Sequence, residues 1–177
     1  QVQGFYGTPS YSSHNQNNYI KFLQEVGEVS KTDELETRFA RGLNRNFLLQ
    51  GWASCKYVLQ RKGDERQFDE NYHSLLTTIN GIEIFANKAY LPLGFTYDQY
   101  QTLADFRKRN VPSYDIQHLS LFYAAVIGPE MQSKFKGLQE WSGNEVPELL
   151  TYSAVSQAIG TRQNAPALTI THHSQTS

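Results

Sequence analysis

The sequence predicts an α+β fold with a small central β-sheet and helices packed mainly on one side. Apolar residues follow helical spacing up to about residue 44. Short aromatic and β-branched runs replace them between residues 52 and 97, and helical spacing returns after residue 98. Hydrophobic residues make up only 39% of the 177 residues, but aromatic residues reach 13% and each can bury a large area. A chain of this length suits one domain with a packed core.

Two helices are expected in the first part of the chain. Residues 18–27 carry apolar side chains at helical spacing, and Gly27 is a suitable stop. Residues 30–44 contain Thr32, which can cap a helix whose acidic first turn suits the positive end of the helix dipole. The apolar positions of this second segment lie on one face, so we expect that face to pack against other elements.

Three short strands near residues 54–60, 82–87 and 93–97 are expected to form the central sheet. The first strand ends in residues 61–73, a highly charged stretch that we expect to be a solvated loop. Pro92 has no amide hydrogen, so we expect it at a strand start, an edge or a break. The alternation within the third strand gives one face that can pack against a helical layer.

Helices are expected again after residue 98. Residues 98–110 place apolar side chains on one face and basic residues near the C-terminal end, whereas residues 116–128 are apolar nearly all round, which indicates burial. The alternating residues 165–177 predict a strand. We therefore expect one α+β domain over residues 1–165, and over residues 166–177 the truncated start of a following β-rich portion.

Composition and motifs argue against several kinds of function. The net charge is −1, from 16 basic and 17 acidic residues, which disfavours nucleic acid as a partner. Phosphate-binding glycine loops, nucleophile elbows and zinc-ligand spacings are absent, so the sequence predicts no catalytic residue and no metal site, and it indicates no particular cofactor. The longest apolar run, residues 119–128, is shorter than the roughly 20 residues of a bilayer span. His118 lies in a helical pattern and is expected to be a packed side chain.

Two regions hold the candidates for ligand binding. The N-terminal region is rich in serine and asparagine and can offer hydroxyl, amide and imidazole groups, with a solvated loop as the alternative. Tyrosines between residues 90 and 100 can stack against sugar rings, or they can belong to the core. The candidates are Tyr11, Ser12, Ser13, His14, Tyr90, Tyr97, Asp98 and Tyr100.

Four stretches of the chain resemble, in the same order, segments of the YfhO family of bacterial multispanning membrane proteins. They are SYSSHNQNNYIKFLQEVG (10–27), GLNRNFLLQGWASCKYVLQR (42–61), EIFANKAY with LPLGFTYDQY (83–100) and DIQHLSLFYAAVI (115–127). LPLGFTYDQY is similar to a signature of that family. The resemblance extends from Gly4 to about Ile127, which is most of the chain.

This resemblance implies a function outside the cytoplasm. YfhO-type proteins look like GT-C glycosyltransferases, which add sugars from a polyprenyl-phosphate donor to cell-envelope polymers such as lipoteichoic acid. The implied location is the extracytoplasmic face of the cell membrane. The implied partners are the membrane-embedded part of the same chain, the lipid-linked donor and the polymer. GT-C enzymes usually carry their catalytic carboxylate between membrane helices, so we expect this segment to be non-catalytic.

Two other classes of function stay open on the residues alone. A stand-alone carbohydrate-binding module would account for the many tyrosines and the polar loops. A cytosolic enzyme would agree with the N-terminal residues, which show no charged region followed by an apolar one and so predict no signal peptide.

Overall fold

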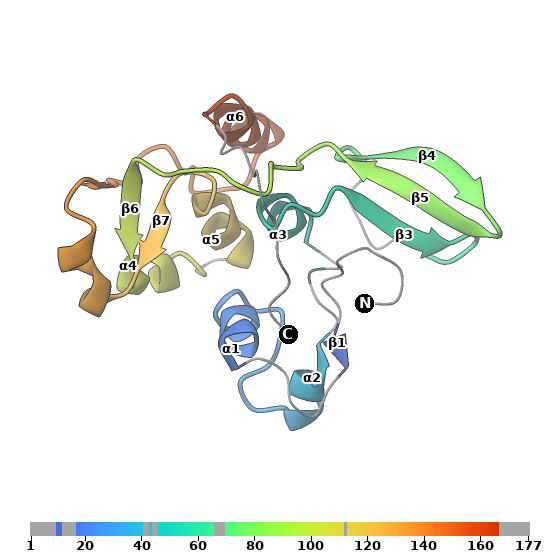
Figure 1. The fold of residues 1–177 in the computed structure, drawn as a ribbon, viewed down its shortest axis with the longest axis horizontal. Helices are drawn as coiled ribbons and strands as arrows, with labels where there is room; N and C mark the ends of the chain where they lie inside the picture. Colours follow the sequence, from blue (N-terminus) through green and yellow to red (C-terminus); the bar gives the residue numbers. More distant parts are fainter. Residues whose placement is uncertain are drawn as a thin grey trace.

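The computed structural model describes residues 10–11, 17–40, 43, 46–65, 70–111 and 113–166. It confirms the α+β class, with helices and two three-stranded sheets. The two sheets lie toward opposite ends of the molecule, and helices α3 and α5 lie between them (Figure 1). Two sheets thus take the place of the single central sheet that we expected, because strands also form in segments where the sequence predicted none.

The N-terminal part contains the two expected helices. Its elements are β1 (Ser10–Tyr11), α1 (Asn17–Glu25), α2 (Glu34–Arg38) and β2 (Phe39–Ala40). Gly27 follows α1 with a φ of +74° and lies against the ring of Tyr114, where an added Cβ would come within 2.7 Å. The second helix is shorter than predicted, because the chain after α2 pairs with β1 as an antiparallel strand.

The strand expected near residues 54–60 starts later than predicted, because a helix and a turn precede it. In α3 (Phe47–Trp52), the Asn46 side chain accepts a hydrogen bond from the Leu49 amide at 2.9 Å and caps the helix. Ser54 then has a φ of +61°, and the strand starts only at Tyr57. The aromatic run that looked like one strand is therefore divided between the end of a helix, a turn and a shorter strand.

Strands β3 (Tyr57–Arg61), β4 (His73–Ile79) and β5 (Ile82–Asn87) form an antiparallel sheet in the order β3-β5-β4. This sheet extends away from the helices as an arm (Figure 1). Asn80 and Gly81 join β4 to β5 with φ values of +50° and +76°, the backbone conformation that a two-residue hairpin turn requires. The Asn-Gly pair explains why β4 forms here.

The prediction of a third strand over residues 93–97 is wrong. The sheet of the arm consists of β3, β5 and β4, and residues 93–97 are not one of its strands. The backbone of residues 93–97 instead accepts a hydrogen bond from Arg162, at 2.6 Å. The described helices also leave one face of the arm in solvent, where Tyr57, Leu59 and Ile79 are 49%, 65% and 55% exposed.

The second sheet is parallel, in the order β7-β6-β8. Its strands and the helices around them are β6 (Gln99–Thr102), α4 (Leu103–Lys108), α5 (Tyr114–Ser120), β7 (Ala125–Ile127), the 3-10 helix η1 (Pro129–Lys134) and β8 (Gln139–Glu140). β6 and β7 correct the prediction of continuous helices over these segments. The Thr102 hydroxyl accepts a hydrogen bond from the Asp105 amide at 3.1 Å, which starts α4 only after β6 has ended. α4 and α5 form the crossover that parallel neighbours need.

Helix α6 (Tyr152–Gln163), which the sequence analysis missed, packs on the body of the molecule. Its Arg162 is only 6% exposed and donates to the backbone carbonyls of Thr96, Phe122 and Tyr123. One guanidinium group thus ties α6 to the segment before β6 and to the turn after α5. Val155, Ala158 and Ile159 of α6 join the core residues Leu48, Leu91, Leu119 and Phe122.

A second core cluster joins the N-terminal part to the body. It contains Leu23, Val26, Val29, Leu43, Leu49, Phe106 and Leu121. Within the described ranges, no helix has the length and apolar character needed to cross a bilayer. Residues 167–177, which include most of the predicted C-terminal strand, lie outside the described residues.

Candidate functional site

Tyr97, the most central of the predicted ligand-binding residues, takes part in the packing between helices. Its hydroxyl accepts a hydrogen bond from the Trp52 indole at 2.8 Å and donates to the Leu121 carbonyl. The guanidinium carbon of Arg162 lies 4.4 Å from the centre of its ring. Burial raises the pKa of Tyr97, which keeps the hydroxyl protonated as a donor. These contacts give Tyr97 the core role that was the alternative to ligand binding.

None of the other described candidates lines the groove that lies beside the parallel sheet. Lys56 Nζ lies 5.7 Å from the ring centre of Tyr90, and the Tyr90 carbonyl accepts a hydrogen bond from Gln163 at 3.0 Å. Asp98 is exposed, and Tyr100 is half-buried in β6. The candidates Ser12, Ser13 and His14 lie outside the described residues. Tyr11 belongs to β1, but its side chain lies outside the described part of the structure.

An open groove of about 1000 Å³ lies beside the parallel sheet. α4, the start of α5 and the chain after β8 form its walls. Its lining combines an apolar wall with charged groups of both signs. The lining residues are Asp105, Lys108, Arg109, Val111, Ile116, Glu140, Trp141, Ser142, Val146, Pro147, Glu148 and Leu149.

Trp141 forms the base of this groove. It follows β8, and its amide donates to the Tyr100 carbonyl at 2.8 Å, so the sheet fixes its position. Its ring stacks with that of Tyr123, with centroids 5.4 Å apart and planes at 10°. Its indole nitrogen donates to Glu145 at 2.7 Å. Because Trp141 is only 5% exposed, it supports the groove more than it offers a free ring face.

Arg109 lies over the ring of Trp141, with its guanidinium carbon 4.7 Å from the ring centre. The residue is the C-cap of α4, and its Nε donates to the Gln101 side-chain oxygen at 3.2 Å. Gln101 is itself held, since its amide donates to the Ser120 hydroxyl at 2.9 Å. A Cβ added to Gly143 would overlap Arg109 Nη2, so the guanidinium also packs against glycine backbone. Three groups, Trp141, Gln101 and Gly143, therefore fix the plane of this cation.

Arg109 has no carboxylate partner within the described part of the chain, and neither terminal nitrogen of its guanidinium donates a hydrogen bond there. The nearby acids have other contacts. Asp105 accepts from the Thr102 hydroxyl at 2.7 Å and pairs with Lys108 at 2.9 Å, and these two contacts lower the pKa of Asp105. Glu145 accepts from Trp141. Burial lowers the pKa of Arg109, as expected for a cation that has lost part of its water.

The described residues of the groove offer polar and apolar groups for binding and show no arrangement for bond cleavage or transfer. Its described polar groups are two cations, three carboxylates and one serine hydroxyl, and none of them forms a base–nucleophile pair by hydrogen bonding. Among the described residues, no three His, Cys, Asp or Glu side chains come together to hold a metal ion. The available chemistry is recognition by a fixed guanidinium, by carboxylate acceptors and by an apolar wall.

Sequence reasoning passed over the residues that form this groove. Arg109 was only one of several basic residues at a predicted helix end, and Trp141 fell in a segment interpreted as mixed loop and short helix. The stretch WSGNE after β8 held a signal, because Ser-Gly-Asn favours a turn and places the tryptophan at its start. The contact between Arg109 and Trp141 joins residues far apart in sequence, so no local pattern could reveal it.

Comparison with known proteins gives no further information about the groove. The chain matches no family model, no curated protein and no solved structure.

Proposed function

We propose that this chain is a non-catalytic extracytoplasmic domain of a YfhO-type membrane glycosyltransferase. In this proposal the enzyme transfers sugar from a polyprenyl-phosphate donor to a cell-envelope polymer of the lipoteichoic-acid type. The membrane-embedded part of the same protein performs the transfer. The domain described here shapes the path of the acceptor polymer.

The observation that carries the proposal is the role of the four stretches that resemble the family. The Tyr97 hydroxyl bonds to Trp52 and Leu121, which lie in the second and fourth stretches, while Tyr97 lies in the third. His118, in the fourth stretch, bonds to the Val26 carbonyl at 2.8 Å and the Asn46 side chain at 2.7 Å, in the first and second. Four hydrogen bonds, two at Tyr97 and two at His118, thus connect all four stretches.

This pattern supports a shared fold better than a shared reaction. Residues kept for catalysis would project into a cleft and would have perturbed proton affinities there. Here Tyr97 and His118 bond instead to backbone carbonyls and to polar side chains of the other stretches, as buried polar groups must. The resemblance therefore supports a common scaffold, and the groove beside β6 and β8 supports a binding role.

A stand-alone carbohydrate-binding module is the second candidate, favoured by the aromatic and acidic lining of the groove. Sugar-binding sites of that kind stack a pyranose ring on an exposed aromatic face. Trp141 is 5% exposed and Tyr123 and Arg109 cover much of its ring, so little face is left for a sugar. The domain of a larger enzyme is therefore the better reading.

The test compares the whole protein with its parts. The native reading frame should encode segments of about 20 apolar residues outside this chain. Membranes containing the full protein should transfer labelled sugar from the lipid donor to polymer, and the isolated chain should transfer none. A full protein without this domain should lose transfer although it still inserts into the membrane. Turnover by the isolated chain, or a reading frame without apolar segments, would contradict the proposal.

A further inference from the structure

We propose that the groove beside the parallel sheet is a binding subsite for a polyhydroxylated phosphodiester, with Arg109 as the residue that binds the phosphate. The identity of the natural ligand as a polyol-phosphate polymer rests on the proposed function. The subsite itself rests only on the geometry around Arg109. It is therefore tested separately below.

The first argument is that Arg109 offers two donors in a fixed plane. Its Nε is held by Gln101 at 3.2 Å, whereas its two terminal nitrogens have no acceptor in the described part of the chain. The edge that carries both terminal nitrogens matches the spacing of two oxygens on a phosphate or carboxylate. Trp141 and Gly143 hold the group in place, so little side-chain entropy is lost when an anion binds.

The second argument is that Arg109 has no carboxylate in direct contact within the described part of the chain. A half-buried cation normally pairs with a carboxylate, because burial without a partner is costly. Asp105, the acid that interacts with Arg109 through space, already pairs with Lys108 at 2.9 Å and bonds to Thr102. An anionic ligand would supply the missing partner. By contrast, the buried Arg162 has partners in three backbone carbonyls.

The third argument concerns the rest of the ligand. Glu140 and Glu148 line the same groove, and carboxylates accept hydrogen bonds from hydroxyl groups. The five charged lining residues carry two positive and three negative charges, which disfavours a ligand with several adjacent anions. Val146, Pro147 and Leu149 provide an apolar wall for a carbon backbone. One phosphate flanked by hydroxylated carbons satisfies all of these groups.

The experiment is an NMR titration of the 177-residue chain with glycerophosphoglycerol, one phosphodiester between two glycerols. Glycerol, inorganic phosphate and glycerate are titrated in parallel, to separate the hydroxyl groups, the bare anion and a carboxylate. We expect saturable shifts of the Arg109 Nε and Trp141 indole signals with the phosphodiester, and weaker binding of the three comparison compounds. In Arg109→Gln, binding should weaken by at least about tenfold, because a charge-assisted pair is lost.

Two further variants make the result specific. Arg61→Gln removes a cation of the same kind from the arm and should leave the affinity unchanged. Arg109→Lys keeps the charge but removes the planar fork, so it should bind more weakly than the wild type and more tightly than Arg109→Gln. If Arg109→Gln fails to fold, the lysine variant carries the test.

Several outcomes would overturn the subsite. The first is that the wild-type protein shows no NMR shifts in the groove. The second is that Arg109→Gln binds the phosphodiester as tightly as the wild type does, and the third is that Arg61→Gln weakens binding as much as Arg109→Gln does. Equal affinity for inorganic phosphate or glycerate would overturn the assignment to a polyol phosphodiester. All of these results leave the membrane transfer assay unaffected. Loss of the subsite and loss of the proposed function are therefore distinguishable.

Discussion

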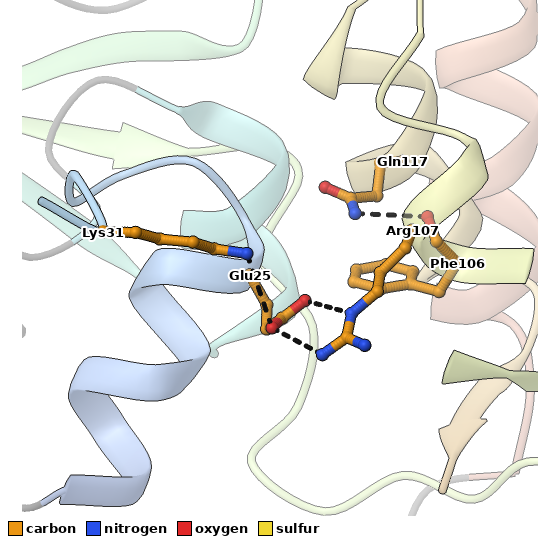
Figure 2. Close-up of polar contacts among 5 residues, drawn as sticks. All are labelled: Glu25, Lys31, Phe106, Arg107 and Gln117. Carbon is orange, nitrogen blue, oxygen red and sulfur yellow. Dashed lines mark hydrogen bonds and ion pairs between the residues drawn. The ribbon is translucent and has the colours of Figure 1, made fainter. Parts of the chain in front are cut away.

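Arg107 of α4 donates two hydrogen bonds to Glu25 at the end of α1, each 2.8 Å long (Figure 2). This two-pronged contact joins elements that are 82 residues apart in sequence. It lies at the edge of the second core cluster, to which Phe106 contributes. Lys31 adds a longer contact to the same carboxylate at 3.8 Å. The α1–α4 junction therefore has an apolar centre and a charged rim.

We predict that Glu25→Gln lowers the free energy of unfolding by about 0.5–1 kcal/mol, a modest value because Arg107 is 54% exposed and the pair is screened by solvent. Bonding to Arg107 lowers the pKa of Glu25 below its usual 4.5. Its stabilising effect is therefore present above pH 4.5 and is lost as the pH falls through the folded-state pKa. Urea titrations at pH 7 and in acid measure this change. Lys31→Gln is the control and should have a smaller effect.

His118 provides a second pH-dependent contact, inside the molecule. It is 3% exposed, and its Nε2 donates to the Val26 carbonyl at 2.8 Å while its Nδ1 accepts from Asn46 at 2.7 Å. The Asn46 side-chain oxygen is occupied by the Leu49 amide, so Asn46 presents its NH2 group. A protonated ring would place two donors face to face. Burial accordingly lowers the pKa of His118 below its usual 6.5, and the Val26 bond and nearby Asp115 only partly oppose this effect.

We predict that the protein loses stability as the pH falls below about 6.5. Below that pH the unfolded chain binds a proton at His118, whereas in the folded chain His118 stays neutral because its pKa is lower. Above pH 6.5 this group makes no pH-dependent contribution. The check is the free energy of unfolding between pH 7.5 and pH 5.5 for the wild type and for His118→Gln. The variant should be less stable at pH 7.5 and should show a shallower decline. Parallel pH profiles would show that His118 is not responsible.

Arg162 should be far more sensitive to substitution than its neighbour Gln163. Arg162→Lys keeps the charge but cannot serve three carbonyls in different directions, so we expect a loss of about 2–4 kcal/mol in the free energy of unfolding. Gln163 also donates to two backbone carbonyls, of Lys88 and Tyr90, but in an exposed position. Gln163→Ala should therefore cost less than about 1 kcal/mol. Chemical denaturation measures the free energy of unfolding of the two variants. Equal losses would show that the three hydrogen bonds of Arg162 do not stabilise the fold more than those of Gln163.

The sequence predicted the α+β class and the first helix because these depend on local periodicity. It also predicted that His118 is packed, since a helical pattern surrounds it. It failed at 93–97, where an alternating pattern does not join the sheet and the Thr96 carbonyl accepts a hydrogen bond from Arg162 instead. It failed at β6, where apolar spacing continued across the cap at Thr102. The partners that decided these positions come from distant parts of the chain.

The groove was hidden from sequence for the same reason. Its two central residues, Arg109 and Trp141, come from the end of α4 and from the chain after β8. They meet because α4 follows β6 and β8 pairs with β6 in the parallel sheet. The ordered stretches that resemble the family gave a hypothesis about function, yet they lie mainly in the contacts that hold the fold. A resemblance of this kind identifies a scaffold more readily than a binding site.

Gly143 offers a direct test of how Arg109 is held. Its φ is +78°, and an added Cβ would overlap the Arg109 guanidinium. Gly81 has a nearly equal φ of +76° but open space around it. We predict that Gly81→Ala costs only the backbone strain of about 1–2 kcal/mol, whereas Gly143→Ala costs more and also moves Arg109 from the Trp141 ring.

Two measurements check the Gly143 prediction, and a double variant isolates its cause. Denaturation gives the difference in stability between Gly143→Ala and Gly81→Ala, and the Trp141 indole signal in NMR reports whether the guanidinium has left the ring. In Arg109→Ala the overlap disappears, so adding Gly143→Ala to that variant should cost no more than Gly81→Ala does in the wild type. If the cost stays as large as in the wild type, Gly143 does not position Arg109 and the groove would lack its fixed cation.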